Sequence, residues 1–217
     1  MTRADYDVWA ASYDAVDNPL VAMTTFAVDE ADWNGKRVLE LGCGTARNAA
    51  RVLAAGAREY VGVDASEGML KRAPDDPRVR LMVGDVSEAP REAFDVVMFC
   101  LVLEHFEALE APLRAAAAAL REGGELRVYE LHPAWWHDGG RAHYVVDGEE
   151  RKVASWAHDE VEFARVLPEV GLGVVSVRSW YAHEAACARS GKLRKRMGRP
   201  VMLEMRAQAA GGTEAKR

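Results

Sequence analysis

The chain has 217 residues, of which 49% are hydrophobic, and a formal net charge of −6. This length predicts one domain, or one domain with an insertion, and the negative charge argues against general affinity for nucleic acids, which needs a basic surface. Three widely spaced cysteines form no disulfide framework, and no signal peptide or apolar run of membrane-spanning length is recognisable. We therefore expect a cytoplasmic protein that does not enter a membrane.

The N-terminal residues place aromatic and apolar side chains among acids, at spacings typical of an amphipathic helical pair. Asn18 and Pro19 interrupt this pattern, because proline is a common boundary of helices. Residues 1–30 are therefore expected to form a helical segment that precedes the main domain, which we place at residues 31–208.

Short apolar runs then alternate with helical patterns. Strands are predicted near residues 37–41, 59–63, 79–83, 94–100 and 124–131, and helices near 46–55, 66–72 and 107–121. Gly123 and Gly124 are expected to end the last of these helices. Regular alternation of strands and helices predicts an α/β fold with a doubly wound, mainly parallel sheet that is covered on both faces, as in Rossmann-like proteins.

The alternation stops at residue 132. Asp147 and Gly148 lie between two β-like runs, which indicates a tight hairpin, so residues 132–158 are interpreted as a small β-rich cap inserted after the fifth strand. A helix is predicted at 159–170, followed by strands near 173–181 and 200–207 as an antiparallel edge pair that completes a seven-stranded sheet. Residues 209–217 are small and polar and should form a flexible tail.

A glycine turn after the first strand predicts a nucleotide-type cofactor. Gly42 and Gly44 allow a ligand to approach the backbone closely, and Asp64 ends the second strand where an acid can bind ribose hydroxyls. A dinucleotide fingerprint has a third glycine where this chain has Arg47, and no Gly-Lys-Ser/Thr follows as in a phosphate-binding loop. An adenosyl cofactor without a pyrophosphate, such as S-adenosylmethionine (SAM), fits this pattern best.

Six short segments in consistent order resemble those of class I SAM-dependent methyltransferases that act on small molecules. The resemblance covers roughly residues 6–131, and the segments are Glu40–Thr45, Val63–Ser66 with Met69 and Leu70, Gly84–Val86, Phe94–Val97, Leu101–His105 and Leu120–Gly124. Ala46 departs from the family, which usually has glycine there. The resemblance implies SAM as the cofactor and residues 1–30 as a segment that folds over its site.

The resemblance also implies a set of cofactor-binding residues. Asp64 would bind the ribose, Asp85 and Val86 the adenine, Glu40 the amino group of SAM, and Arg47 either the SAM carboxylate or solvent. The aromatic residues Tyr6, Trp9 and Tyr13 would fold over the methionine end or simply pack on the sheet. The full predicted set is Tyr13, Glu40, Gly42, Cys43, Gly44, Arg47, Asp64, Ala65, Met69, Asp85, Val86 and Cys100.

Two histidines near strand ends are candidates for contact with the methyl acceptor. Methyl transfer depends mainly on alignment of donor and acceptor, but an oxygen or nitrogen acceptor can require a base, and histidine suits that task. His105 follows the fourth strand and His132 ends the fifth; a structural role remains open for both. No His-x-x-x-His spacing links the further histidines of the insertion, so no metal site is predicted.

A tryptophan pair and a basic run each allow two interpretations. Trp135 and Trp136 form either an aromatic wall for an acceptor or a packing anchor for the hairpin. The basic run 192–196 is a solvated face or a site for a phosphorylated or acidic substrate.

The sequence therefore predicts methyl transfer from SAM to a small-molecule acceptor, by a monomer or homodimer with no nucleic-acid partner. The alternatives are a SAM-binding regulator, or an enzyme that uses SAM for a reaction other than methylation. Arg47 at the third glycine position disfavours a nicotinamide oxidoreductase.

Overall fold

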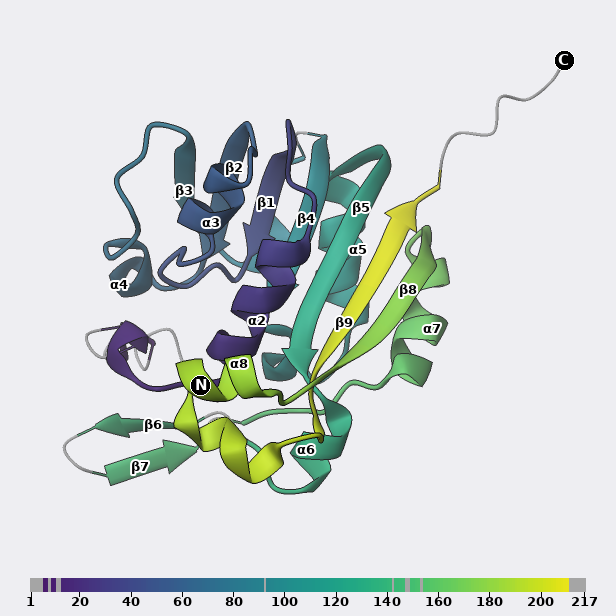
Figure 1. The fold of residues 1–217 in the computed structure, drawn as a ribbon. Coiled ribbons are helices and arrows are strands. Elements are labelled where there is room, and N and C mark those ends of the chain that lie inside the picture. Colours follow the sequence, from purple (N-terminus) through teal and green to yellow (C-terminus); the bar gives the residue numbers. More distant parts are fainter. Residues whose placement is uncertain are drawn as a thin grey trace, which may run out of the picture.

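The computed structural model describes residues 6–7, 9–10, 13–91, 93–141, 143–146, 149–152 and 154–210. Its main feature is a seven-stranded sheet with the strand order β3-β2-β1-β4-β5-β9-β8 (Figure 1). The strands are β1 (Arg37–Leu41), β2 (Glu59–Asp64), β3 (Val79–Val83), β4 (Phe94–Cys100), β5 (Leu120–Leu131), β8 (Leu172–Tyr181) and β9 (Pro200–Ala209). The first five run parallel, and β9 is antiparallel to both β5 and β8. The predicted doubly wound, mainly parallel fold is confirmed.

Helices cover both faces of this sheet. One apolar cluster joins β1, β4 and β9 to α2 (Pro19–Glu30), α3 (Ala49–Ala54), α8 (Glu184–Arg189) and the 3-10 helix η4 (Gly191–Arg196). A second cluster, on the opposite face, joins the sheet to α5 (Glu110–Ala119) and α7 (Glu160–Glu169). Because side chains alternate along a strand, Glu40 and Cys100 lie on the α3 side of the sheet.

Most predicted strand bounds agree closely with the structure, but β5 begins at Leu120 and not near residue 124, and two helix bounds are wrong. The expected helix over 107–121 ends at Ala119, and Gly123 and Gly124 do not cap it, because Leu120 already pairs with Phe94 as the first residue of β5. The expected helix over 46–55 begins only at Ala49, since Ala46 has a φ of +52° and belongs to the turn.

The N-terminal segment is helical at the described residues Tyr6, Asp7 and Trp9 and again in α2. It contains the 3-10 helix η1 (Tyr13–Ala15) and then α2. Asn18 caps α2, because its side chain accepts a hydrogen bond from the Leu20 N–H at 2.9 Å, and Pro19 occupies the first helical position. The predicted break at these two residues is thus the start of a helix.

The insertion after β5 contains a helix as well as a hairpin. It begins with α6 (Pro133–His137) and continues into the antiparallel strands β6 (His143–Val146) and β7 (Glu149–Lys152), while the turn predicted at Asp147 and Gly148 lies outside the described residues. The hairpin lies beyond the end of the sheet at which β4 and β5 end (Figure 1).

Three shorter elements complete the sheet connections: α4 (Glu67–Leu70), η2 (Val86–Glu88) and η3 (Leu103–His105). β9 extends to Ala209, and most of the predicted tail, from residue 211, lies outside the described residues. Within the described part of the chain, every helix is too short or too polar to cross a bilayer.

Candidate functional site

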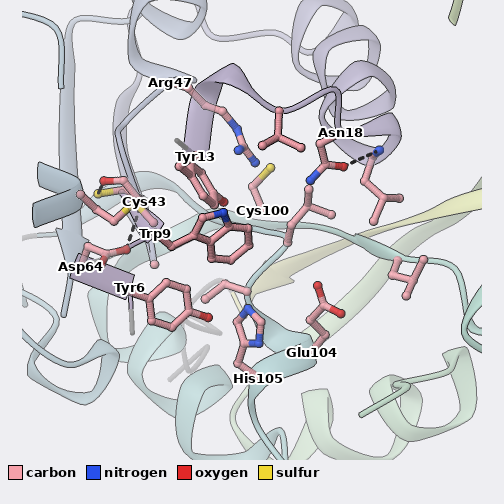
Figure 2. A pocket seen from close by; sticks show the side chains of 18 of the residues that line it. Tyr6, Trp9, Tyr13, Asn18, Cys43, Arg47, Asp64, Cys100, Glu104 and His105 are labelled. Carbon is pink, nitrogen blue, oxygen red and sulfur yellow. Dashed lines mark hydrogen bonds between the residues drawn. The ribbon is translucent and has the colours of Figure 1, made fainter. Parts of the chain in front are cut away.

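A cavity of about 680 Å³ opens at the carboxyl ends of the parallel strands (Figure 2). The loops after β1, β2, β3 and β4 form one side of it, and the N-terminal segment, η3, α6 and η4 contribute the remainder. The structure brings every predicted cofactor-binding residue and His105 to its wall: Tyr13, Glu40, Gly42, Cys43, Gly44, Arg47, Asp64, Ala65, Met69, Asp85, Val86, Cys100 and His105.

Asp64 and the glycine turn form one hydrogen-bonded unit. The Gly44 N–H donates to Asp64 Oδ2 at 2.7 Å, and the Ser66 N–H donates to Oδ1 at 2.8 Å. Gly42 has a φ of +71°, and a Cβ there would lie 2.3 Å from a methyl carbon of Val102, so glycine is required on both counts. Burial raises the pKa of the Asp64 carboxyl, and these two backbone hydrogen bonds oppose that shift.

Glu40 is only 2% exposed and already has protein partners. Asn48 Nδ2 donates to Oε1 at 2.8 Å, and the Tyr60 hydroxyl donates to Oε2. Burial raises the pKa of the Glu40 carboxyl to about 7, although both hydrogen bonds and the positive charge of Arg47 oppose the shift. We predicted that the cationic amino group of SAM would be the partner of the Glu40 carboxylate. In the structure, neutral donors from Asn48 and Tyr60 already bind both of its oxygens.

The N-terminal aromatic residues form one side of the cavity. Their rings make a continuous row, with centroids 6.0 Å apart between Tyr6 and Trp9 and 4.7 Å apart between Trp9 and Tyr13. The guanidinium carbon of Arg47 lies 5.4 Å from the Tyr13 ring centroid, which is within cation–π range. Asp7 fixes this row against α4, because its Oδ1 accepts from the Gly68 N–H at 2.9 Å.

Asp85 and Val86 lie at the end of the cavity near β3. Asp85 caps η2, since its Oδ1 accepts from the Ser87 N–H at 2.9 Å, and its side chain remains exposed at the cavity rim. Val86 is buried. Both residues line the cavity, and their binding of adenine stays a prediction.

The opposite side of the cavity is formed by the turn η3. Glu130 holds this turn, because its Oε1 accepts from the Val102 N–H at 2.8 Å and the Leu103 N–H at 2.7 Å. The turn presents Glu104 and His105, whose side chains lie next to each other and face the aromatic row in Figure 2. The His105 ring lies edge-on to Tyr6 at 5.8 Å, and burial lowers the pKa of His105 to about 4, so its imidazole is neutral at pH 7.

His132 is the one predicted site residue that does not line the cavity. Its Nδ1 accepts from the Ala134 N–H at 3.1 Å and thereby caps α6, and its Nε2 lies 3.1 Å from Ser179 Oγ. The strand end was located correctly in the sequence, but the side chain turns away from the crevice. The structure gives His132 a capping role in place of the predicted acceptor contact.

Several lining residues were not in the predicted set, because they come from segments distant in sequence. Trp135, Gly140 and Arg141 reach the cavity from the insertion, while Trp136 lines a separate depression. The basic run is partly structural: Lys192 also lines the cavity and donates to the Asp17 carbonyl at 2.7 Å. In the sequence, only the basic run 192–196 pointed to Lys192 as a possible ligand contact.

The other charged contacts of the insertion are also structural. Arg196 forms an ion pair with Asp138 at 2.6 Å, which ties η4 to the end of α6. Across the described residues, no three histidine, cysteine or acidic side chains are grouped as a metal site would require. The three cysteines are buried and free.

The methyltransferase domain family matches residues 38–124. Among curated proteins, the chain is 31% identical over 72% of its length to the 27-O-demethylrifamycin SV methyltransferase of Amycolatopsis mediterranei, of which it covers 54%. It is 32% identical over 57% of its length to the tRNA U34 carboxymethyltransferase of Colwellia psychrerythraea, of which it covers 36%. The chain spans between 35% and 54% of the first curated relatives that it matches.

Solved structures share the fold. An S-adenosylmethionine-dependent methyltransferase from Mesorhizobium loti superposes with a TM-score of 0.68 at 20% identity, over 85% of this chain and 96% of that one.

Proposed function

We propose that the chain is a class I SAM-dependent methyltransferase, which binds SAM in the described cavity and transfers the methyl group to a small-molecule acceptor; the methyltransferase domain match over residues 38–124 and the shared fold support this. The observation that carries this proposal is the hydrogen bond from the Gly44 N–H in the glycine turn to the Asp64 carboxylate. It places a fixed carboxylate where ribose hydroxyls bind in this fold, beside a backbone that a ligand can approach closely.

The residues present fit such a cofactor in size and charge. A cavity of about 680 Å³ has room for a cofactor and a small second ligand. Carboxylates line its end near β2 and β3, which suits hydroxyl and amino donors and would repel a pyrophosphate. Arg47 lies at the other end of the glycine turn, where a carboxylate group of the ligand would find a partner.

The chemistry of the bound group is the transfer of an electrophilic methyl from a sulfonium. The residues of the chain then have three tasks: to orient the donor and the acceptor, to exclude water from the cavity, and to accept the proton that the acceptor loses. The aromatic row formed by Tyr6, Trp9 and Tyr13 covers the cavity, and the turn held by Glu130 positions Glu104 and His105 on the acceptor side. Holding donor and acceptor in line supplies most of the rate enhancement in such a reaction.

A small acceptor is favoured over a nucleic acid by two features. The net charge of the chain is −6, and the cavity places Glu104 and aromatic side chains beside the site where the acceptor would lie. Free buried cysteines fit a reducing compartment, so we propose a cytoplasmic location and activity as a monomer or homodimer.

Calorimetric titration with SAM, with its demethylated product and with NAD tests this proposal. We expect micromolar or tighter binding of the first two and no binding of NAD. Incubation with methyl-labelled SAM and a metabolite pool should then give a labelled small molecule together with the demethylated cofactor. Binding of NAD in place of SAM would overturn the assignment.

A second candidate is an enzyme that uses a SAM-type cofactor for something other than methylation, or a regulator that only binds it. It is favoured by the similarity to a protein named as a carboxymethyltransferase that acts on a tRNA. Mass spectrometry of the product separates the candidates: methylation adds a single methyl group, another group transfer adds a different mass, and a regulator forms no demethylated cofactor with any acceptor pool. A tRNA fraction included in the acceptor pool tests the nucleic-acid alternative.

A further inference from the structure

The acceptor side of the cavity contains a buried carboxyl group with an unused hydrogen-bonding atom. Glu104 is 6% exposed, and its Oε2 has no hydrogen-bond partner among the described residues. Figure 2 shows this side chain pointing into the cavity beside His105. A buried polar atom without a partner costs free energy, and one that faces a cavity can recover it from a ligand.

The backbone around Glu104 is fixed, so the carboxyl group is held in place. The Trp156 N–H donates to the Glu104 carbonyl at 2.9 Å, and Glu130 binds the two residues before it. This arrangement presents the side chain from a rigid turn, which favours a specific contact over a mobile surface charge.

The charged and titratable groups that act on Glu104 or lie beside it are Glu130, His105 and Arg141. Glu130 repels it, and His105 is neutral at pH 7 because burial lowers the pKa of that ring to about 4. Arg141 attracts it, but the Arg141 guanidinium donates to the carbonyls of Trp136 and Gly140 and stacks on the Trp136 ring at 3.5 Å. A hydrogen-bond donor from a ligand would therefore be the natural partner of the free oxygen.

Aromatic side chains line the same cavity as Glu104. They include Tyr6, Trp9, Phe106 and Trp135. Rings of this kind bind planar, largely apolar molecules through area burial and offset or edge-on contacts.

We propose that Glu104 binds the acceptor, which we infer to be a planar and largely apolar molecule with one O–H or N–H group, and that it receives the proton of that group during methylation. This inference rests on the proposed function and names its substrate class. The acceptor oxygen or nitrogen forms the new bond to the methyl carbon, the pair of the broken carbon–sulfur bond stays on sulfur, and the proton passes to the Glu104 carboxylate.

The pKa of Glu104 suits a proton acceptor near neutral pH better than the pKa of His105 does. Burial raises the pKa of Glu104 to about 7, opposed by the charge of Arg141, so the carboxylate can accept a proton near neutral pH. Turnover should thus rise as the pH increases through about 7, because the ionised form is the active one.

Ligand binding to the wild-type protein gives the first test. The probes are 2-naphthol, 2-naphthylamine and 2-methoxynaphthalene, titrated by ligand-observed NMR with the demethylated cofactor present. We expect the two donors to bind at least about tenfold more tightly than the ether, since a hydrogen bond to a charged group is worth about 1.5–3 kcal/mol. The relative turnover of naphthol and naphthylamine with SAM tells oxygen from nitrogen acceptors.

Substitution gives the second test. Glu104→Gln should bind SAM within about twofold of wild type, lose turnover of the donor probe by about 100-fold or more, and lose the rise through pH 7. Glu107→Gln changes an exposed acid near the same turn and should leave all three unchanged. Glu104→Asp keeps the carboxyl group and should retain the pH dependence at reduced rate, which covers the case in which the glutamine variant fails to fold.

The outcomes are distinguishable. Equal binding of naphthol and its ether, no methylation of either donor, or wild-type turnover by Glu104→Gln would overturn this inference while leaving the proposed function intact if SAM binds. Absence of SAM binding to the wild-type protein would overturn the proposed function and this inference with it.

Discussion

The two sides of the cavity differ in how far their polar groups are satisfied. On the cofactor side, Glu40 and Asp64 each accept two hydrogen bonds from the protein. On the acceptor side, Glu104 Oε2 and His105 Nδ1 are buried without a partner within the described structure. A satisfied network fixes its own geometry, whereas unsatisfied groups are completed by what binds. If the proposed function holds, the cofactor would meet a preformed site, whereas the chemistry of the acceptor would complete the other side.

The two sides meet where the glycine turn packs against Val102, the residue that leads into η3. The largest effect should therefore come from Gly42→Ala, which adds a methyl group that overlaps Val102 and imposes the strain of a positive φ. We expect a loss of about 2–4 kcal/mol in the free energy of unfolding, measured by denaturant titration.

Gly35→Ala is the matched control for that change. Gly35 has a similar φ of +69° but has open space around its Cβ position, so it should show the strain without the overlap. Equal losses of unfolding free energy in the two variants would mean that the overlap of the new methyl group with Val102 does not destabilise the protein.

The next largest effect should fall on the cofactor side alone. Asp64→Ala removes the acceptor of both backbone hydrogen bonds and the proposed ribose contact, so SAM affinity should fall by about 10- to 100-fold in calorimetric titration. Glu67→Ala changes an exposed acid at the start of α4 and should bind SAM as wild type does. An unchanged dissociation constant for a folded Asp64→Ala protein would remove Asp64 from the site.

A substitution in the insertion should affect the acceptor side alone. Trp135→Ala should spare SAM affinity and lower turnover by about tenfold, because Trp135 lines the cavity and would help to orient the acceptor. Trp156→Ala is the control, since Trp156 lines the separate depression and its backbone N–H, which contacts Glu104, is kept in the variant. Parallel loss of SAM binding and turnover would instead make the insertion part of the common core, and no change in either would make it a passive surface element.

The last effect is a pH dependence of stability, which needs no substitution. Burial raises the pKa of Glu40 and of Glu104 to about 7 and that of Glu130 to about 8, so the folded chain holds protons that the unfolded chain releases. The free energy of unfolding should therefore fall as the pH rises. The slope is at most about 1.4 kcal/mol per pH unit for each carboxyl group that is still protonated.

The window for this measurement is set by His105. Its lowered pKa of about 4 opposes the trend below its ordinary value of 6.5, so the net fall should be clearest between pH 6.5 and 8. Glu130→Gln keeps an oxygen for the Val102 and Leu103 N–H groups and should flatten the slope. A slope that is unchanged in this variant would show that Glu130 does not titrate in this range.

The sequence predicted most strands well and found residues that line one side of the cavity, whose binding of a cofactor stays a prediction. The bounds of β1, β3 and β4 were predicted closely, because each is a short apolar run that the sheet buries. The cofactor residues follow strand ends directly, so their place at one edge of the sheet follows from topology.

The acceptor side depends on tertiary packing, which local patterns do not encode. Arg141 and Lys192 reach the cavity only because the insertion and η4 fold toward it. His132 was placed correctly at the end of β5. The position at a strand end does not determine the direction of its side chain, which caps α6. The glycines after α5 looked like a helix cap, yet pairing of Leu120 with Phe94 starts a strand before them.

The position of β9 has a consequence for how the chain is made. β9 is the last strand among the described residues and yet lies between β5 and β8, paired with β5 from Glu125 opposite Gln208 to Leu131 opposite Met202. During synthesis β5 emerges long before its neighbour, and it remains an open edge while the insertion, α7 and β8 are added. The sheet closes only when Pro200–Ala209 has emerged, so a nascent chain halted earlier exposes the strand edge that the finished protein keeps inside.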